Sequence, residues 1–484
     1  MLGSVAKGAA PSRPHEVLFD WLDRLPALAV GAGLVALALV AYWLPGTDRI
    51  YNHFVWQALA FLDGRAWIDW PVPGFPDGNE WMQDVYPLSE LTGETYGALL
   101  PFPPLPGILL MPFVAIGGLA TDIRAVSVAL GAINVGIAWW ALGRLAVGRR
   151  IRLATTVFFG FGTVAWYAAQ LGTTWFFAHV CALTFLLLAL GVAFGADPGA
   201  DDEVEDAPSL RDMAQAAAAA VRKPAALLDR RQFVAGLLFG IACTARLTVV
   251  FGAPFFMLVG GGGSWLRRSA SAGLGAIIPV GLLLAYNVAT TGHVFHPGYE
   301  YQYQKEANGY QALGYHPDWA IEDLRYVPQN LGIMFLSTPA ILPASEPDAF
   351  GGEGDAVCTL PDERRGLFER DCPIAMPRAI GTSILLTSPA FLLIGWALYR
   401  HRSRLAAGAL LAMLAIAFVN LMHFSQGWVQ FGYRFSNDFV AFALPLVAVG
   451  MQRRGGVGVL GFWLVAAAVA FNLWGVIWGN ILGW

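Results

Sequence analysis

The chain has 484 residues, of which 56% are hydrophobic and only 13% are charged, and its formal net charge is −4. Soluble domains carry about 25% charged residues, and a chain of this length cannot build a core large enough to bury so much apolar surface. The composition therefore excludes an ordinary soluble protein and predicts a polytopic membrane protein. The small net charge, without a block of basic residues, argues against a nucleic-acid partner.

Apolar runs of about 20 residues predict helices rather than the alternating strands of a membrane barrel. We expect an all-α membrane protein with about eleven transmembrane helices and two large outer-face loops that carry juxtamembrane helices. The expected spans are 27–44, 125–143, 153–171, 174–195, 232–246, 247–262, 270–288, 380–399, 405–422, 437–451 and 457–478. The stretch 232–262 fits either one tilted helix or two short helices that meet near Arg246.

The arginines and lysines predict the orientation. Basic residues fall in the N-terminal segment and then in every second connection between the expected spans, and such residues concentrate on the cytoplasmic side. These connections contain Arg144–Arg152, Arg222–Arg231, Arg267–Arg268, Arg400–Arg404 and Arg453–Arg454. We therefore predict a protein of the cytoplasmic (inner) membrane, with its N-terminus inside and its long polar loops outside.

The order of apolar and polar segments divides the chain into eight parts. The first run is too long for the apolar region of a signal peptide, so we interpret it as a true span. The parts are a cytoplasmic N-terminus (1–26), the first transmembrane helix (27–44), an outer loop (45–124), transmembrane helices (125–195), a cytoplasmic linker (196–231), transmembrane helices (232–288), a second outer loop (289–379) and C-terminal transmembrane helices (380–484). Connections as long as the two outer loops usually form lids or binding sites.

The four cysteines fall into two pairs. Cys181 and Cys243 lie in expected spans, where we interpret them as small core residues. Cys358 and Cys372 share the second outer loop, where an oxidising exterior favours a disulfide over two free thiols. No spacing resembles a zinc or haem site, and no cofactor is assigned; the pattern leaves open whether a divalent cation assists.

The first candidate site follows the first span, in the sequence PGTDRIYNHFVWQALAFLDGRAWIDWP. Apolar residues at helical spacing up to Leu62 predict a surface helix that starts at Asp48. Asn52 would share one side of this helix with Asp48, and His53 would lie nearby. A carboxylate at the membrane edge can act as general base on an acceptor hydroxyl. The alternative is that Asp48 only stabilises the start of a helix by its charge.

The second candidate is YGALLPFPPLPGILLMPFVAIGG, from Tyr96 to Gly118. Its prolines predict a rigid, extended entry into an apolar stretch that is too short to cross the membrane and return. We expect this stretch at the membrane interface, either as part of a binding site or as a stiff loop.

The third candidate is a pair of arginines at outer ends of spans, Arg246 and Arg434. Such arginines can reach lipid headgroups, but the guanidinium also matches two phosphate oxygens at once, so these two are candidates for a lipid-phosphate clamp. Polar and aromatic residues expected on the same side add candidate substrate contacts. They are Gln430, Tyr433, His296, Tyr299 and Glu300.

The order of these features resembles the C-type membrane glycosyltransferases (GT-C), in the branch of the protein O-mannosyltransferases and the lipid A aminoarabinose transferase. In that branch an acidic pair opens the first outer loop, and a Tyr–x–x–x–Pro–Pro–Leu stretch closes it. Here TDRIYNHFVWQALAFLDGRAWID stands at the first position and YGALLPFPPLPG at the second, with Pro103–Pro104–Leu105 matching the motif. The similarity covers about the first 270 residues.

The resemblance implies an enzyme of the cell envelope that moves a sugar from a polyprenyl-phosphate donor to an acceptor hydroxyl on the outer face, with inversion. The acceptor would be a lipid, a protein or a polysaccharide, and the donor and membrane lipids would be its other partners. Asp48 would be the catalytic base, although Arg49 stands where the family often has a second acid. Asp84 and Glu94 are the alternative bases. The competing hypothesis is a secondary transporter or lipid flippase, for which the sequence lacks inverted repeats and mid-span carboxylates.

Overall fold

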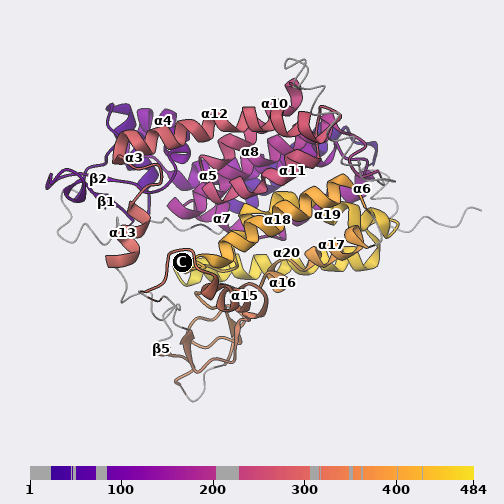
Figure 1. Cartoon of the computed structure of the whole chain (residues 1–484). Coiled ribbons are helices and arrows are strands. Elements are labelled where there is room, and N and C mark those ends of the chain that lie inside the picture. The colour runs from indigo at the N-terminus through magenta and orange to yellow at the C-terminus, as the bar shows by residue number, and fades with distance from the viewer. Residues whose placement is uncertain are drawn as a thin grey trace, which may run out of the picture.

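The structure is a computed structural model, and it is mostly helical (Figure 1). It describes residues 23–44, 46, 51–71, 84–202, 228–305, 316, 318–347, 353–360, 364–399, 402–427 and 429–484, without the side chains of 302–305 and 353. All structural statements below concern these residues.

Five helices are long and apolar enough to cross a membrane. They are α5 (Ile123–Leu142), α8 (Thr174–Ala196), α12 (Trp265–Thr291), α18 (Arg404–Met422) and α20 (Gly458–Ile481). Shorter helices fill the spaces between them: α2 (Ala27–Trp43), α6 (Arg149–Phe161), α7 (Ala165–Leu171), α10 (Arg230–Cys243), α11 (Ala253–Leu258), α16 (Ile384–Thr387), α17 (Ile394–Leu398) and α19 (Val440–Arg453). Helix α8 is the most enclosed of the five long helices and packs against α5 and α10.

Small residues set the closest helix crossing, between α10 and α12. A Cβ atom added to Gly236 would stand 2.0 Å from the carbonyl oxygen of Ala272, and one added to Gly275 would stand 2.2 Å from that of Phe233. The two backbones therefore touch at a point where only glycine fits. Such close approaches are typical of helix association in membranes, where packing and not the exclusion of water holds helices together.

The predicted all-α architecture is confirmed, but several predicted spans are not single helices. The span expected at 153–171 is broken between α6 and α7, where Gly162 ends the first helix and the Thr163 hydroxyl bonds back to the Phe159 carbonyl at 2.7 Å. The span expected at 380–399 is divided into α16, the 3-10 turn η7 (Pro389–Leu393) and α17, because Pro389 cannot continue the ladder of hydrogen bonds. The stretch 232–262 is two segments, α10 and then η4 (Leu247–Gly252) with α11, separated at Arg246.

The segment predicted as the first outer loop contains the helices α3 and α4. It also contains the short 3-10 turn η1 (Leu88–Glu90) and a small antiparallel pair, β1 (Tyr86–Pro87) with β2 (Ala98–Leu99). Its first helix, α3 (His53–Leu62), starts five positions later than predicted, because Tyr51 and Asn52 are not helical. The Tyr51 carbonyl instead accepts from the Thr174 amide at 3.1 Å, which ties this segment to the start of α8. The second helix, α4 (Leu105–Gly117), begins directly after Pro103–Pro104 and is followed by η2 (Gly118–Ala120), so the proline-rich entry leads into a short helix that packs on α3.

The second outer loop holds α13 (Gly298–Lys305), η6 (Leu324–Tyr326) and α15 (Val327–Leu336), followed by two small antiparallel ladders. The ladders pair β3 (Ala340–Ile341) with β6 (Ala375–Met376), and β4 (Ser345–Pro347) with β5 (Glu353–Ala356).

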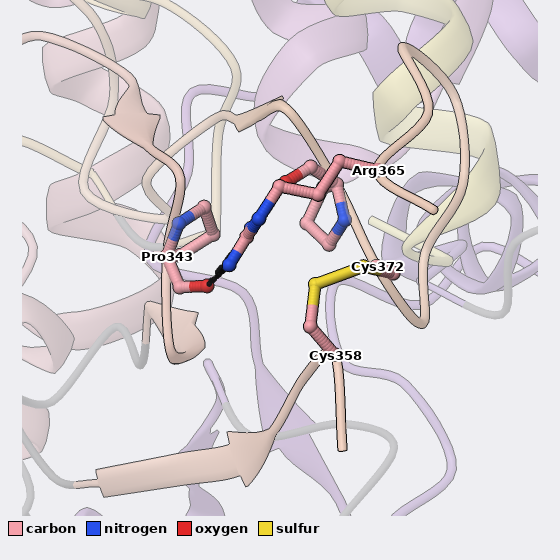
Figure 2. The surroundings of a disulfide bond; sticks show 5 residues. Pro343, Cys358, Arg365 and Cys372 are labelled. Carbon is pink, nitrogen blue, oxygen red and sulfur yellow. Dashed lines mark hydrogen bonds between the residues drawn. A yellow bond between two sulfur atoms is a disulfide. The ribbon is translucent and has the colours of Figure 1, made fainter. Parts of the chain in front are cut away.

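The predicted disulfide is present between Cys358 and Cys372, whose Cα atoms lie 4.4 Å apart. Beside it the Arg365 guanidinium donates to the carbonyl oxygens of Pro373 at 2.7 Å and Pro343 at 3.2 Å (Figure 2). One side chain and one covalent bond thus join four segments of this loop, around Pro343, Cys358, Arg365 and Cys372–Pro373. Cys181 and Cys243 are free and buried, as expected of core residues.

Charged side chains tie the basic end of the helix bundle together. Asp197 at the end of α8 pairs with Arg404 at 2.7 Å, and Asp201 pairs with Arg453 at 2.9 Å. The start of the predicted linker 196–231 is therefore bound to α18 and α19, while residues 203–227 of that linker lie outside the described part of the chain. The end opposite to these pairs carries α3, α4, α13 and the β1–β2 ladder (Figure 1).

Candidate active site

The strongest polar cluster lies at the end of the bundle opposite to the basic end and is centred on Asp438. This residue closes the 3-10 turn η8 (Arg434–Asp438), and its side chain has no exposed surface. Arg246, in the break after α10, donates from Nε to Oδ1 at 3.1 Å and from a terminal nitrogen to Oδ2 at 2.9 Å. This side-on geometry fixes the plane of the guanidinium, since both carboxylate oxygens are engaged.

Three further side chains complete the shell of Asp438. Its Oδ2 accepts from the Thr248 hydroxyl at 2.9 Å and from the Asn420 amide at 3.2 Å. His179, one helical turn into α8, places Nδ1 2.8 Å from Oδ1. Four segments therefore meet here: α8, the break at 246–248, α18 (Arg404–Met422) and η8 itself. Of the residues that contact the Asp438 carboxylate, Arg246 carries a positive charge, and the carboxylate fixes its orientation.

Arg434 and Arg246 contact the same aromatic ring. Its guanidinium carbon is 5.2 Å from the ring centre of Phe435, and that of Arg246 is 5.4 Å from the same ring. Phe176 of α8 packs on Arg434 as well, at 5.6 Å. Two arginines that are far apart in the sequence thus contact one phenylalanine ring, and their role as a phosphate clamp stays a prediction.

Gln430 and Tyr433, which were predicted as substrate contacts, are both fully buried. The Gln430 amide nitrogen donates to the Gln426 carbonyl at 2.7 Å and the Ile380 carbonyl at 3.0 Å, so this side chain shapes the backbone around the turn. The Tyr433 hydroxyl is buried without a hydrogen-bond partner among the described residues. Tyr433 therefore packs under the site, and its ring contacts Phe435 at 6.1 Å.

A carboxylate from the first outer loop lies on the other side of the start of α8. Asp84 accepts from the indole nitrogen of Trp175 at 2.5 Å. The Trp175 ring also contacts Tyr51 at 5.0 Å and His53 at 5.9 Å. His53 is buried, its Nδ1 lies 2.8 Å from the Thr174 hydroxyl, and burial lowers its pKa to about 3, so the ring is neutral.

Tyr299 of α13 packs on the same side of the site as His53. Its ring contacts Phe102 at 6.0 Å, and the Phe102 ring contacts His53 at 6.3 Å. Tyr299 itself is 37% exposed.

The other predicted contacts differ in their exposure. His296 accepts from the Gly298 amide through Nδ1 at 3.0 Å, and burial lowers its pKa to about 4. Glu300 is exposed, and Asn52 is half-buried at the start of α3. Glu94 is exposed, and its amide bonds the Thr92 hydroxyl at 3.4 Å.

Asp48, the predicted catalytic base, lies outside the described residues. Its neighbours on both sides are fixed. Arg124 donates to the Trp43 carbonyl at 2.7 Å, and Tyr51 is bound to the start of α8. The role of Asp48 therefore stays a prediction from the sequence.

Sequence reasoning missed the residues that hold the site together. Asp438, Trp175, Thr248 and Asn420 were not predicted as site residues. One signal was available in the sequence. Asp438 stands at the start of a strongly apolar helix, where a charged side chain needs a partner of opposite charge, and Arg246 also stands between two apolar segments. The described part of the chain contains no group of three or more His, Cys, Asp or Glu side chains that could hold a metal ion.

No family model and no curated protein sequence matches this chain. Among solved structures, the chain is similar to the oligosaccharyltransferase of Archaeoglobus fulgidus in its apo form, with a TM-score of 0.43 and 12% sequence identity. The aligned region covers 96% of this chain and 56% of that one, so this chain spans a little more than half of the length of the archaeal enzyme. A likeness at this level assigns neither a family nor an activity.

Proposed function

We propose that this protein is a membrane glycosyltransferase of the GT-C type, which transfers a sugar from a polyprenyl-phosphate donor to an acceptor hydroxyl at the outer end of the helix bundle. One observation carries the proposal most directly: Arg246 and Arg434 contact the same Phe435 ring. Two guanidinium groups on one ring at the end of a helix bundle suit a lipid phosphate, which offers several anionic oxygens at the level of the headgroups.

In this proposal Arg434 makes the main phosphate contact and Arg246 supports it. Asp438 already occupies one edge of Arg246 through two hydrogen bonds. That edge cannot also hold a phosphate, so Arg246 contributes mainly its fixed positive charge. A charge that is already oriented costs little reorganisation when the leaving phosphate gains negative charge.

The reaction needs one carboxylate. The base takes the proton of the acceptor hydroxyl. At the same time the acceptor oxygen bonds to the anomeric carbon, on the face opposite to the leaving phosphate. The bond from that carbon to the phosphate oxygen breaks, and the polyprenyl phosphate leaves with the electron pair. Because the arginines stabilise this leaving group, no second acid has to protonate it.

We assign the base to Asp48, with Asp84 and Glu94 as alternatives. Asp48 precedes Tyr51 by three residues, and the Tyr51 ring packs on Trp175, which holds Asp84. Asp84 thus lies beside the start of α8, at the end of the bundle that carries the arginines. Glu94 is the weaker alternative, because it is exposed.

The competing hypothesis, a secondary transporter or flippase, expects ionisable groups near the centre of the spans. The five long helices contain no Asp or Glu. The polar cluster lies at the helix ends instead, which supports a transferase.

The proposal is tested by mass spectrometry of lipid-linked sugars and cell-surface glycans from cells with and without the protein. A transferase predicts that one sugar disappears from a surface glycan while its polyprenyl-phosphate-linked form accumulates. Identical glycans and identical lipid-linked sugars in the two strains would contradict the proposal. A flippase predicts that the same lipid-linked sugar accumulates but stays on the inner leaflet, where added impermeant reagents do not reach it.

A further inference from the structure

A cavity of about 510 Å³ lies at the basic end of the bundle, far from the candidate active site. It is formed by the end of α8, the start of α10 and the loop that leads into α12. Helix α10 begins in this cavity at Arg230 and ends at Cys243, three residues before Arg246. Fourteen helical residues span about 21 Å, so the cavity and the Arg246–Asp438 pair lie at opposite ends of the bundle.

The walls of the cavity are strongly cationic. Three arginines line it, Arg230, Arg231 and Arg267, against one acid, Asp229. The Asp229 carboxylate is engaged in capping α10, where it accepts from the Gln232 amide at 2.9 Å. The arginines therefore outweigh the acid, and the cavity has a net positive charge.

The arginines retain hydrogen-bonding capacity. Arg267 donates from one terminal nitrogen to the Leu228 carbonyl at 3.0 Å, but its buried Nε has no acceptor within the described part of the chain. Arg231 makes a 3.3 Å bond to the Gly195 carbonyl. Arg230 is exposed and makes no ion pair with a described residue. Buried donors without a partner are rare in native proteins and call for a ligand or another explanation.

The loop beside the cavity is rigid, although it contains four consecutive glycines. The Gln232 amide nitrogen donates to the carbonyls of Phe256 at 2.7 Å and Val259 at 3.2 Å, and its oxygen accepts from the Gly261 amide at 3.0 Å. A Cβ atom on Gly261 would stand 2.4 Å from the Asp229 carboxylate. Gly262 has a φ of 110°, which a side chain would strain. These glycines thus allow the loop to lie directly against the start of α10, where the hydrogen bonds of Gln232 hold the wall of the cavity in place.

We infer that this cavity binds the phosphate group of a phosphate ester at the end of the bundle that we predict to be cytoplasmic. Guanidinium groups bind phosphate oxygens through paired, charge-assisted hydrogen bonds, and basic pockets between membrane helices on the cytoplasmic side typically hold anionic headgroups. The phosphate belongs either to an anionic lipid of that leaflet or to a soluble phosphate, since both present the same group. The inference does not depend on the proposed transferase activity.

The test compares two variants, one without the three arginines of the cavity and one without three other arginines at the same end of the bundle. The cavity variant is Arg230→Gln with Arg231→Gln and Arg267→Gln. The control variant is Arg150→Gln with Arg402→Gln and Arg454→Gln, which removes the same charge but none of the cavity lining. Native mass spectrometry of the purified full chain in detergent measures retained phosphatidylglycerol against phosphatidylcholine, and calorimetric titration measures inorganic phosphate.

Each arginine near a phosphate contributes roughly a fivefold change in affinity, so the cavity variant should bind about 100-fold more weakly than the wild type and the control. Loss of phosphatidylglycerol from this variant alone, without competition by inorganic phosphate, supports the inference and identifies a lipid. Binding of inorganic phosphate that only the cavity variant loses supports it and identifies a soluble ligand.

Equal retention of the two lipids by the wild type, equal binding by the cavity and control variants, or no binding of either probe would each overturn the inference. If the triple variant does not fold, Arg230→Glu gives the same answer. Arg230 is exposed, so a reversed charge there disturbs no packing and should still weaken binding at least tenfold.

Discussion

Arg246 and Asp438 are 192 positions apart in the sequence, and they meet through two parallel hydrogen bonds at 3.1 and 2.9 Å. Asp438 is fully buried and the side chain of Arg246 is 19% exposed. A pair in this position adds little net stability by itself, but the loss of one partner leaves the other charge uncompensated. The pair thus joins the segment after α10 to η8 and fixes the orientation of the Arg246 guanidinium.

The first prediction concerns this pair. Asp438→Ala should lower the free energy of unfolding by about 3–5 kcal/mol, because Arg246 would remain charged in a largely buried place. Denaturant unfolding in detergent measures the change. Asp323→Asn, in the surface pair with Arg325 at 2.6 Å, is the control and should have no measurable effect. Equal stability of the two variants would show that Asp438 does not hold Arg246.

The second prediction concerns the phosphate contact. Arg434→Lys should weaken binding of a polyprenyl-phosphate-linked sugar about tenfold, and Arg434→Ala up to about 100-fold. A lysine ammonium cannot form the bidentate hydrogen bonds of a guanidinium to two phosphate oxygens, and it has no planar group to stack on the Phe435 ring. Equilibrium binding of the donor to the purified protein measures both. Arg454, which stacks on Trp396 at 4.4 Å at the basic end of the bundle, provides the matched control Arg454→Lys. Unchanged affinity in Arg434→Ala would rule out the contact.

Much of this arrangement could be predicted from the sequence, for definite physical reasons. Apolar runs such as 174–195 and 405–422 fix the long helices α8 and α18, since backbone groups in a membrane must be bonded within a helix. The pairing of Cys358 with Cys372 followed from their common loop. The placement of Arg246 and Arg434 at one end followed from where their spans begin and end.

Other features could not be predicted, because they depend on contacts between distant segments. The later start of α3 depends on the hydrogen bond between Tyr51 and Thr174, 123 positions away. The break between α6 and α7 is stabilised by a local bond of Thr163, and its neighbour Gly162 must lie close to Ala468 of α20. The Asp438 cluster joins four segments, and no local pattern specifies which polar residues in them will meet.

The third prediction concerns the disulfide. Replacing Cys358 and Cys372 by serine should increase proteolytic cleavage within 343–373 and leave the helical bundle intact, since closing a loop of this size contributes roughly 3 kcal/mol to local order in the chain-entropy model. Limited proteolysis followed by peptide mass spectrometry measures the change. Treatment of the wild type with a reductant should reproduce it. A cleavage pattern that neither change alters would show that the Arg365 contacts hold the loop without the disulfide.

The fourth prediction concerns pH. Burial lowers the pKa of His296 to about 4, below the ordinary value of 6.5. Between these two pH values the imidazole is protonated in the unfolded chain and neutral in the folded chain. Stability should therefore be unaffected by this residue above pH 6.5 and should fall as the pH decreases from 6.5 towards 4. His296→Asn keeps an acceptor near the position of Nδ1 and removes the titration. Thermal unfolding at several pH values should show a shallower decline for this variant, and parallel curves for the two proteins would contradict the assignment.

The proposed role of Asp48 as general base in sugar transfer is tested by the turnover of Asp48→Asn with a polyprenyl-phosphate-linked sugar. The substitution keeps the shape of the side chain and removes its basicity, so turnover should fall by about two to four orders of magnitude while donor binding stays the same. Asp84→Asn, measured in parallel, should have a much smaller effect. Wild-type turnover in Asp48→Asn would contradict the assignment of Asp48, and wild-type turnover in the variants of Asp48, Asp84 and Glu94 alike would contradict the whole account.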